Sequence, residues 1–397
     1  MAQSISMLST YPPTRCGIAT FAQSLADALA FQGVDVRIAA LSNGVDGIPA
    51  SDGQESEDSI VCHQHQGPSD TRATARELNS ADVAVIQHEF GIFDGPDGDE
   101  VLAIAERLGV PIITVIHTAP AAPRSSQRRI LQRLLDISDA VVALSYSAAR
   151  VLRRGYEVRP RSLHVIPHGT LDLWHRRRQA TPAATPRLLT WGLIGRGKGL
   201  EWMLQALALA DDLDPLPEYI IAGTTHPKVH QDEGDRYLDE LRDLGESLGV
   251  SERVRFVDTY LDPPRLASLV AEADAFVLPY DNDEQVTSGV LVEALAAGGP
   301  VISTRFPHAR ELLGTGGGLL VNRRNPHQLA DAIRIVVNDA ARNRVMRDVA
   351  IATSRNFLWH RVAEQYIALA DELTTFDENR LRPRPIVRIP AATAARS

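Results

Sequence analysis

The sequence predicts an α/β protein in which two doubly wound domains face a central cleft. Short apolar runs alternate with longer stretches whose apolar residues recur every three or four positions, a pattern typical of βαβ units around a parallel sheet. This rhythm stops over residues 175–187 (HRRRQATPAATPR) and then restarts. The 397 residues suffice for two cores, because a single core stops growing at about 250–300 residues.

Residues 1–174 are predicted to form the first domain. Residues 18–33 show a helical apolar period and end at Gly33, a residue type that commonly follows a helix. The predicted strands of this domain lie at residues 5–10, 35–41, 82–88, 111–117, 140–145 and 164–169.

A second domain of similar size is predicted for residues 188–355, after a linker at 175–187 that has no apolar period. Residues 377–397 are rich in Arg, Pro and Ala and predict a mobile tail. The predicted strands of the second domain lie at residues 188–194, 218–224, 254–260, 275–280, 300–304 and 317–321. Because ligands of open α/β sheets bind beyond the carboxyl ends of the strands, we expect site residues directly after strands.

Composition and charge exclude several classes of protein. The formal net charge of −9 argues against nucleic acid as the main partner, but it leaves contact with a membrane surface open. Cys16 and Cys62 lack CxxC spacing, which fits a reducing compartment. The first residues lack the pattern of a signal peptide, and no apolar run approaches the roughly 20 residues of a membrane helix. We therefore expect a soluble, cytoplasmic protein.

Polar residues follow three predicted strands of the first domain. Gly17 stands where a proline-rich loop enters a helix, and helix N-termini bind anions, although an ordinary tight loop explains it equally well. His88, Glu89 and His117 each follow a strand, where they can contact the hydroxyls of a donor or an acceptor. His88 and His117 stand in neither HExxH nor His-x-His spacing, so we do not favour a metal between them.

The first loop of the second domain, within GLIGRGKGLEWMLQAL, combines glycines with two cations. Gly195 and Gly197 let the backbone bend against a ligand, and Arg196 and Lys198 bring positive charge to a helix start. A planar guanidinium and a mobile ammonium both suit a diphosphate. The loop lacks the spacing of a Walker A motif, so it indicates a phosphate-binding loop without identifying a particular nucleotide-binding family.

The stretch QVTSGVLVEALAAGGPVIST, residues 285–304, carries the strongest signal. Thr287, Ser288 and Gly289 are small residues at a helix start, where backbone amides can approach phosphate oxygens. Gln285 and Glu293 lie about 12 Å apart by helical rise, so they can address two ends of one ligand. In isolation, a surface Gln and an ordinary helical Glu would explain these two residues as well.

Other polar residues surround this stretch. Asp281 and Asp283 match the Asp-x-Asp triplet of metal-dependent sugar transferases, but chance is the better explanation in a chain with 50 acidic residues. His308 and Glu311 follow the next strand, and we expect them on the same rim as Glu293. We expect no metal and no other cofactor.

With these motifs, the chain resembles the family 4 glycosyltransferases, which are retaining enzymes of the GT-B fold with two Rossmann-like domains. The resemblance covers nearly the whole chain and includes the Pro-Pro…Gly-Ile loop, VIPHGTLD, GLIGRGKGLEWMLQAL, AGTTHP and residues 285–304. QHEFGIF and SGVLVEALAAG look most like a bacterial subgroup labelled mannosyltransferase-like. The fold also implies that a last helix, residues 356–376, packs back on the first domain.

The resemblance implies roles for particular residues. Lys198 would bind the donor diphosphate and Glu293 the ribose hydroxyls, with His117 near the transferred sugar and Gly17 near the diphosphate. The amides of Ser288, Gly289 and Val290 would bind phosphate.

Two positions depart from the pattern of the family. Gln285 replaces the first Glu of the family's pair, and Leu193 replaces an arginine, for which Arg196 is the candidate substitute.

The function implied is transfer of a hexose from a nucleotide-diphosphate sugar to a hydroxyl of a glycan or other acceptor, with retention and without a metal. The subgroup favours mannose from GDP-mannose, although the residues do not distinguish guanine from uracil. A front-face path fits better than a covalent intermediate, because no carboxylate stands out as a nucleophile. Two alternatives stay open: a sugar-nucleotide epimerase or hydrolase of similar fold, and a non-catalytic protein that binds sugar nucleotides.

Overall fold

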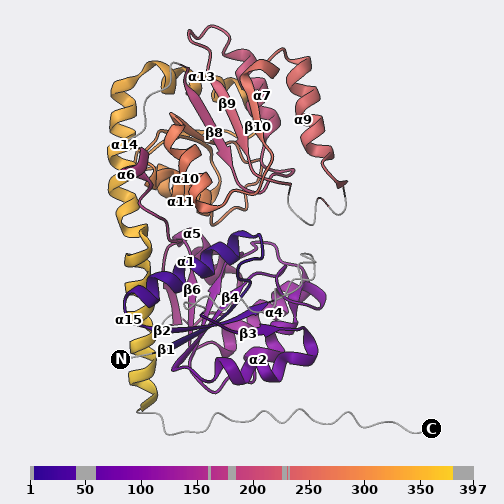
Figure 1. Cartoon of the computed structure of the whole chain (residues 1–397), viewed down its shortest axis with the longest axis vertical. Coiled ribbons are helices and arrows are strands. Elements are labelled where there is room, and N and C mark those ends of the chain that lie inside the picture. The colour runs from indigo at the N-terminus through magenta and orange to yellow at the C-terminus, as the bar shows by residue number, and fades with distance from the viewer. Residues whose placement is uncertain are drawn as a thin grey trace, which may run out of the picture.

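Two parallel β-sheets, each covered by helices, form two lobes (Figure 1). Residues of both lobes line a cleft between them. The computed structural model describes residues 4–41, 60–159, 162–177, 185–225, 230 and 233–378. In the first lobe the strand order is β3-β2-β1-β4-β5-β6-β7, and in the second it is β10-β9-β8-β11-β12-β13. In both orders the chain starts in the middle of the sheet and winds to either side, so both lobes are doubly wound as predicted.

The first lobe contains every strand predicted for it, and one more. Its strands are β1 (Ser4–Ser9), β2 (Asp35–Leu41), β3 (Val61–His65), β4 (Val83–His88), β5 (Ile112–Ile116), β6 (Ala140–Ala143) and β7 (Leu163–Val165). Its helices are α1 (Gly17–Phe31), α2 (Thr71–Leu78), α3 (Glu100–Ala105), α4 (Ser125–Ile137) and α5 (Tyr146–Gly155). The unpredicted strand is β3, whose sequence VCHQH lacks an apolar run because it lies at the sheet edge.

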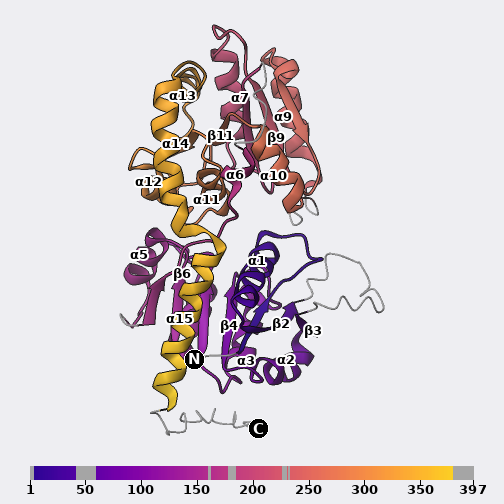
Figure 2. The ribbon, with the colours of Figure 1, turned by 60° about the vertical axis from the view of Figure 1, so that its left-hand side comes forward.

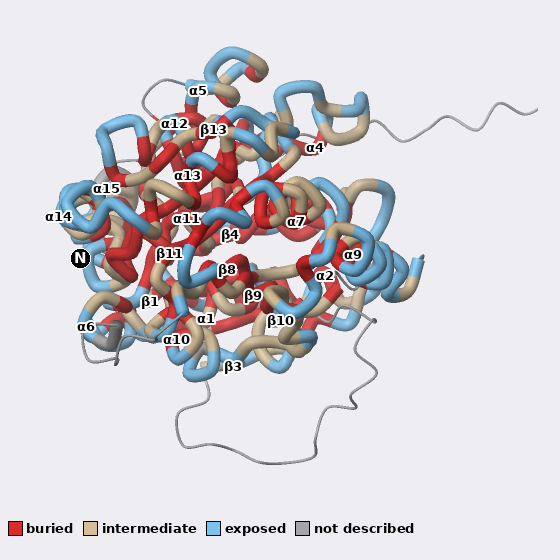
Figure 3. The backbone as a smooth tube through the Cα atoms, turned by 90° about the horizontal axis from the view of Figure 1, so that it is seen from above, coloured by how far each residue is buried: buried red, intermediate tan, exposed pale blue. Residues whose placement is uncertain are grey.

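The second lobe repeats the architecture. Its strands are β8 (Arg187–Trp191), β9 (Glu218–Ala222), β10 (Val254–Val257), β11 (Ala275–Leu278), β12 (Val301–Thr304) and β13 (Leu319–Val321). Its helices are α6 (Leu173–Arg177), α7 (Leu200–Leu209), α9 (Arg236–Ser247), α10 (Pro263–Glu272), α11 (Gly289–Ala296), α12 (Pro307–Leu313), α13 (Pro326–Asn338) and α14 (Ala340–Ser354). Strands β8, β9, β11 and β12 are largely buried among the helices, as red segments of Figure 3 show, whereas the edge strand β10 is partly exposed.

The last described helix, α15 (Trp359–Glu378), returns to the first lobe and runs along it (Figure 2). Val362, Ala363 and Tyr366 are fully buried in the core cluster of the first sheet, against α1. Leu173 already belongs to a core cluster of the second sheet. The chain therefore crosses between the lobes twice, and both crossings lie beside the cleft.

The exact domain limits stay predictions. Residues 178–184 of the predicted linker and 379–397 of the predicted tail lie outside the described residues. Among the helices that the structure describes, none is long and apolar enough to cross a membrane.

Candidate active site

A cleft of about 760 Å³ lies between the carboxyl ends of the two sheets and is lined by both lobes. From the first lobe come the loop after β1, the start of α1 and the residues that follow β4, β5 and β7. From the second lobe come the loops after β8, β9 and β10 and the first turns of α11. This size and position suit a small-molecule ligand bound between the sheets.

The glycine loop after β8 brings Lys198 into the cleft. Gly199 has a left-handed φ of 68°, and a Cβ added to it would lie 2.0 Å from the carbonyl oxygen of Pro279. The amide of Asp281 donates to the carbonyl of Gly197 at 2.9 Å, which fastens the loop to the end of β11. Lys198 lines the cleft, with its Nζ 4.4 Å from the centre of the Tyr280 ring. The loop therefore holds a cation at the cleft wall.

Replacing Gly199 with alanine is expected to destabilise the second lobe. The strained backbone alone costs about 1–3 kcal/mol, and the contact with Pro279 adds to this cost. Differential scanning calorimetry should show a Tm lower by at least about 4 °C. Gly195→Ala is the matched control, because an added Cβ there meets nothing within 4 Å. Equal Tm values for the two variants would contradict this account of the loop.

Arg196 points away from the cleft. Its guanidinium pairs with Glu240 at 2.9 Å and with Glu233 at 3.4 Å, and it lies over the Tyr237 ring. Arg196 does not line the cleft, and neither do Gly195 and Gly197. The expectation that Arg196 substitutes for the arginine missing at Leu193 is therefore not met in this geometry. Acidic partners on the surface hold its side chain outward.

The start of α11 presents backbone amides to the cleft. Thr287, Gly289 and Val290 line it, and the amides of the first turn of a helix have no partner within the helix. Ser288 is the N-cap, and its hydroxyl accepts from the amide of Leu291. The expectation that the amide of Ser288 binds phosphate needs correction, because this amide donates to Nδ1 of His308 at 2.9 Å. Gly289 and Val290 remain suited to a phosphate.

His168, which was not among the candidate site residues, meets the start of α11 from the first lobe. A Cβ added to Gly289 would lie 2.7 Å from Nε2 of His168. Nδ1 of His168 donates to the carbonyl of Gly169 at 2.7 Å, so Nε2 carries the lone pair. Burial lowers the pKa of His168 to about 4, so the ring is neutral at pH 7. The sequence feature that could have identified His168 as a site residue is its position shortly after β7, within the motif VIPHGTLD.

Glu293 lies in the second turn of α11 and lines the cleft. Trp191 Nε1 donates to its carboxylate at 2.9 Å. Burial raises the pKa of Glu293 to about 7, although the hydrogen bond from Trp191 opposes the rise. A buried carboxyl with one partner is ready to accept hydrogen bonds from ligand hydroxyls, which would favour its ionised form.

His117 closes the cleft on the side of the first lobe. Its Nε2 lies 2.8 Å from the amide oxygen of Gln87, which can only accept, so Nε2 carries the proton and Nδ1 the lone pair. Burial, followed by the neighbouring His168 and His88, lowers the pKa of His117 to about 3. His117 is therefore a neutral ring whose Nδ1 can accept a hydrogen bond. The ring also packs edge-on against Phe21.

The neighbours of His117 differ in access to the cleft. Glu89 and Gly17 line it. Glu89 accepts hydrogen bonds from the amide of Phe90 and the hydroxyl of Thr118. His88 is fully buried and does not reach the cleft, so its expected contact with substrate hydroxyls is not met.

Gln285, His308 and Glu311 do not line the cleft. The side-chain amide of Gln285 donates to the carbonyl of Thr287, so it fixes its own loop instead of facing a sugar. Glu311 accepts from the amides of Tyr146 and Ser147, at the start of α5 in the other lobe. The expected rim around Glu293 is therefore not formed: Gln285 and His308 bond residues of their own lobe, and Glu311 joins the two lobes.

Arg15, another residue that the candidate set lacked, lies at the mouth of the cleft. Its guanidinium lies over the ring of Tyr260 from the second lobe, 5.8 Å from the ring centre. Arg15 and Lys198 are the basic residues among the described residues that line the cleft. The acidic pair Asp281 and Asp283 instead bonds Arg323 and Arg324 outside it.

Fold and site together define a two-domain glycosyltransferase. Residues 16–170 match the family model described as Glycosyltransferase Family 4, and residues 185–339 match the model described as Glycosyl transferases group 1. The two matches cover both lobes, and the chain is a glycosyltransferase of family 4 with the GT-B fold.

Curated relatives are D-inositol 3-phosphate glycosyltransferases. The protein of that name from Corynebacterium glutamicum (strain R) is 28% identical over 66% of this chain and 67% of its own length. The one from Corynebacterium diphtheriae is 27% identical over 68% of this chain and 66% of its own length. The chain thus matches about two thirds of the length of these relatives.

Solved structures share the fold at low identity. Sucrose-phosphate synthase from Thermosynechococcus elongatus aligns with a TM-score of 0.74 and 20% identity, over 94% of this chain and 100% of that chain. Anabaena HepE, in complex with UDP and glucose, aligns with a TM-score of 0.71 and 18% identity, over the same shares of the two chains. At this identity the similarity establishes the two-lobed fold.

Proposed function

We propose that the chain transfers a hexose from a nucleotide-diphosphate sugar to a hydroxyl acceptor, with retention at the anomeric carbon and without a catalytic metal. The observation that carries this proposal is the placement of Lys198, the first amides of α11 and Glu293 along one wall of the cleft. A cation and amides suit a diphosphate, and a carboxyl one to two turns further suits a ribose.

The chemistry is stabilisation of a leaving group. As the bond from the anomeric carbon to the diphosphate breaks, negative charge grows on the phosphate oxygens, and Lys198 and the amides of Gly289 and Val290 stabilise it. The acceptor oxygen bonds the same face of that carbon and passes its proton to the departing phosphate. Of the carboxylates that line the cleft, Glu89 is held by Thr118 and Phe90, and Glu293 is assigned to the ribose. This distribution favours the front-face path over a covalent intermediate.

The donor that we propose is GDP-mannose, on the resemblance to the mannosyltransferase-like subgroup. The complex of Anabaena HepE with UDP and glucose makes uridine donors the main alternative. For the acceptor, the names of the relatives suggest an inositol phosphate or another phosphorylated polyol. Arg15 supports an anionic acceptor, because it brings positive charge to the cleft mouth from the first lobe.

The test is a thermal-shift screen of GDP and UDP sugars, followed by mass spectrometry of reactions with the best donor. Inositol phosphate, free inositol and a glycan serve as acceptors. We expect one donor to raise the Tm and to yield a glycosylated product together with free nucleoside diphosphate. If no nucleotide sugar or nucleoside diphosphate binds in calorimetry, the proposal is wrong.

A non-catalytic role in binding sugar nucleotides is the second candidate. It is favoured by Leu193, an apolar residue in the cleft wall where the resemblance implies an arginine, and by Gln285, which is turned into its own loop. Donor binding with neither transfer nor hydrolysis, over the full set of acceptors, would select this candidate.

A further inference from the structure

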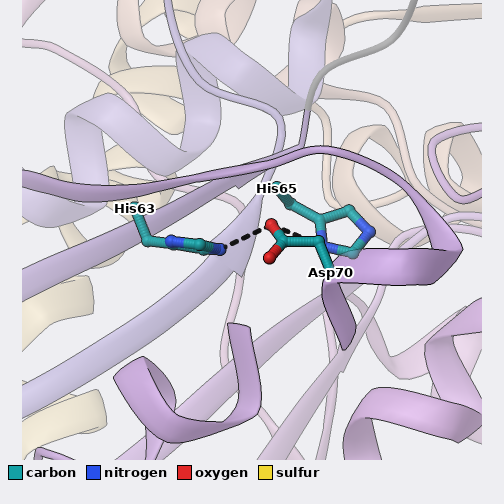
Figure 4. A group of neighbouring side chains, drawn as sticks. All are labelled: His63, His65 and Asp70. Atoms are coloured by element: carbon teal, nitrogen blue, oxygen red, sulfur yellow. Dashed lines mark hydrogen bonds and ion pairs between the residues drawn. The ribbon is translucent and has the colours of Figure 1, made fainter. Parts of the chain in front are cut away.

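Two histidines and an aspartate converge at the edge of the first sheet, away from the residues that line the cleft. His63 and His65 are alternate residues of β3, so their side chains leave the same face of the strand. Asp70 ends the short turn that leads into α2. Figure 4 shows the Asp70 carboxylate between the two imidazole rings.

The three ligand atoms have the separations of a metal site. Asp70 Oδ2 lies 2.8 Å from Nε2 of His63 and 3.9 Å from Nδ1 of His65, and all three atoms lie within 4.8 Å of one another. Ligands at about 2.0–2.1 Å from a tetrahedral zinc ion stand roughly 3.3 Å apart, a separation that the first two distances bracket. Small side-chain rotations would equalise them, and the ion would displace the proton that Nε2 of His63 donates to Asp70 when no metal is bound.

A buried carboxylate supports this arrangement independently. The other ring nitrogen of His65, Nε2, lies 2.9 Å from Oε1 of Glu100, and both side chains are less than 5% exposed. Because a carboxylate only accepts, Nε2 carries a proton, and Nδ1 is the nitrogen turned towards His63 and Asp70. A histidine whose remote N–H is held by a carboxylate is the usual arrangement at protein metal sites.

We propose that His63, His65 and Asp70 bind one divalent transition-metal ion, with zinc the expected occupant. Imidazole nitrogens select zinc and its neighbours over Mg²⁺ and Ca²⁺, which prefer oxygen ligands. A water would complete a tetrahedron. The side chains of His63 and Asp70 are 21% and 18% exposed, which lets a hydrated ion reach them. This proposal revises our expectation of a chain without metal, although it places the ion outside the cleft.

The ion would have a structural role that reaches the cleft wall. The second oxygen of Glu100, Oε2, accepts from the amide of Asp94 at 3.2 Å. Asp94 belongs to the loop after β4, and Gly91 and Ile92 of the same loop line the cleft. A metal that fixes His65 would therefore also fix Glu100 and, through it, this loop.

The competing explanation is a hydrogen-bonded cluster without metal. Thr74 Oγ1 lies 2.7 Å from Nδ1 of His65 and 3.1 Å from Nε2 of His63, so it already partners both nitrogens. It also lies 3.2 Å from the carbonyl oxygen of Asp70. The hydroxyl would therefore keep a partner when the two nitrogens turn to an ion.

The experiment uses the full chain without an affinity tag, dialysed against a chelator and then against metal-free buffer. ZnCl₂ is titrated by calorimetry, bound zinc is counted by mass spectrometry, and Tm is measured with and without zinc. CoCl₂ replaces zinc for visible spectroscopy, because tetrahedral Co²⁺ absorbs strongly. The variants are His63→Gln and Asp70→Asn, which alter partly exposed ligands. His327→Gln, an exposed histidine in α13, is the matched control.

We expect one zinc per chain, a higher Tm with zinc and a tetrahedral cobalt spectrum for the native chain and for His327→Gln. For His63→Gln and Asp70→Asn we expect at least a tenfold loss of affinity and little change of Tm with zinc. Absence of stoichiometric zinc, or zinc that both variants retain at native affinity, would overturn the proposal. Neither result would bear on the transferase proposal, which nucleotide-sugar binding tests separately.

Discussion

Replacing Lys198 with alanine is expected to lower kcat/KM for the donor by about 10²–10³-fold, the usual cost of removing one preorganised group that stabilises developing charge. Lys198 lines the cleft beside Tyr280, and no ion pair of its ammonium is found among the described residues. Its charge is therefore available to the departing diphosphate. Because the Lys198 side chain lines the cleft and does not belong to a hydrophobic core, its removal should change the Tm by no more than about 2 °C. Steady-state kinetics and calorimetry measure the two quantities.

Arg196→Ala is the matched control, two residues earlier in the same loop. Its guanidinium pairs with Glu233 and Glu240 on the surface, so kcat/KM should stay within about threefold of the native value. The contrast between the two variants separates a role in the cleft from a general need for positive charge. If Arg196→Ala loses as much activity as Lys198→Ala, the assignment of the diphosphate to Lys198 is wrong.

Donor affinity is expected to rise with pH through about 7, the pKa that burial gives Glu293. Ribose hydroxyls donate to the ionised carboxylate, so the fraction of ionised Glu293 limits binding. If only that form binds, the Kd at pH 6 should be about tenfold weaker than at pH 8. A nucleotide sugar is the probe for calorimetry, because its diphosphate has no terminal phosphate that titrates in this range.

Glu293→Gln supplies the control for this pH dependence. The amide keeps the shape of the side chain and can still pair with Trp191, but it does not titrate. The variant should bind the donor more weakly than the native chain at pH 8, and its Kd should show no step near pH 7. If the Kd of this variant depends on pH as that of the native chain does, another group titrates, and the assignment of the ribose to Glu293 is wrong.

The same pKa shift predicts how the stability of the free protein depends on pH. Glu293 has a raised pKa in the folded state, about 7 against an ordinary 4.5. The unfolded chain therefore loses this proton first, and the contribution of Glu293 to the free energy of unfolding falls as pH rises from about 4.5 to about 7. Glu293→Gln should remove this decline. Urea unfolding at several pH values measures this decline in the free energy of unfolding. An equal decline in the native chain and in Glu293→Gln would contradict the raised pKa of Glu293.

Much of the two-lobed architecture can be predicted from the pattern of apolar residues within short segments. Buried parallel strands are continuous apolar runs, so segments such as ISMLST (5–10) and AFVLPY (275–280) are recognisable as strands before the fold is known. The edge strand β3 was missed for the converse reason, because one side of an edge strand needs no apolar residues and VCHQH has none of the usual signal. That omission also hid the alternation of His63 and His65.

The sequence by itself determined the two doubly wound lobes and the wall of the cleft that holds Lys198, Gly289 and Glu293, because apolar periodicity and glycine position act over a few neighbouring residues. Only the tertiary structure decided which way individual side chains point. Arg196 and Lys198 stand two residues apart, yet Glu240 draws the first outward, while the second faces the cleft. His168 meets Gly289 from more than a hundred residues away. Such partners depend on how two sheets are placed in space, which no local pattern of residues encodes.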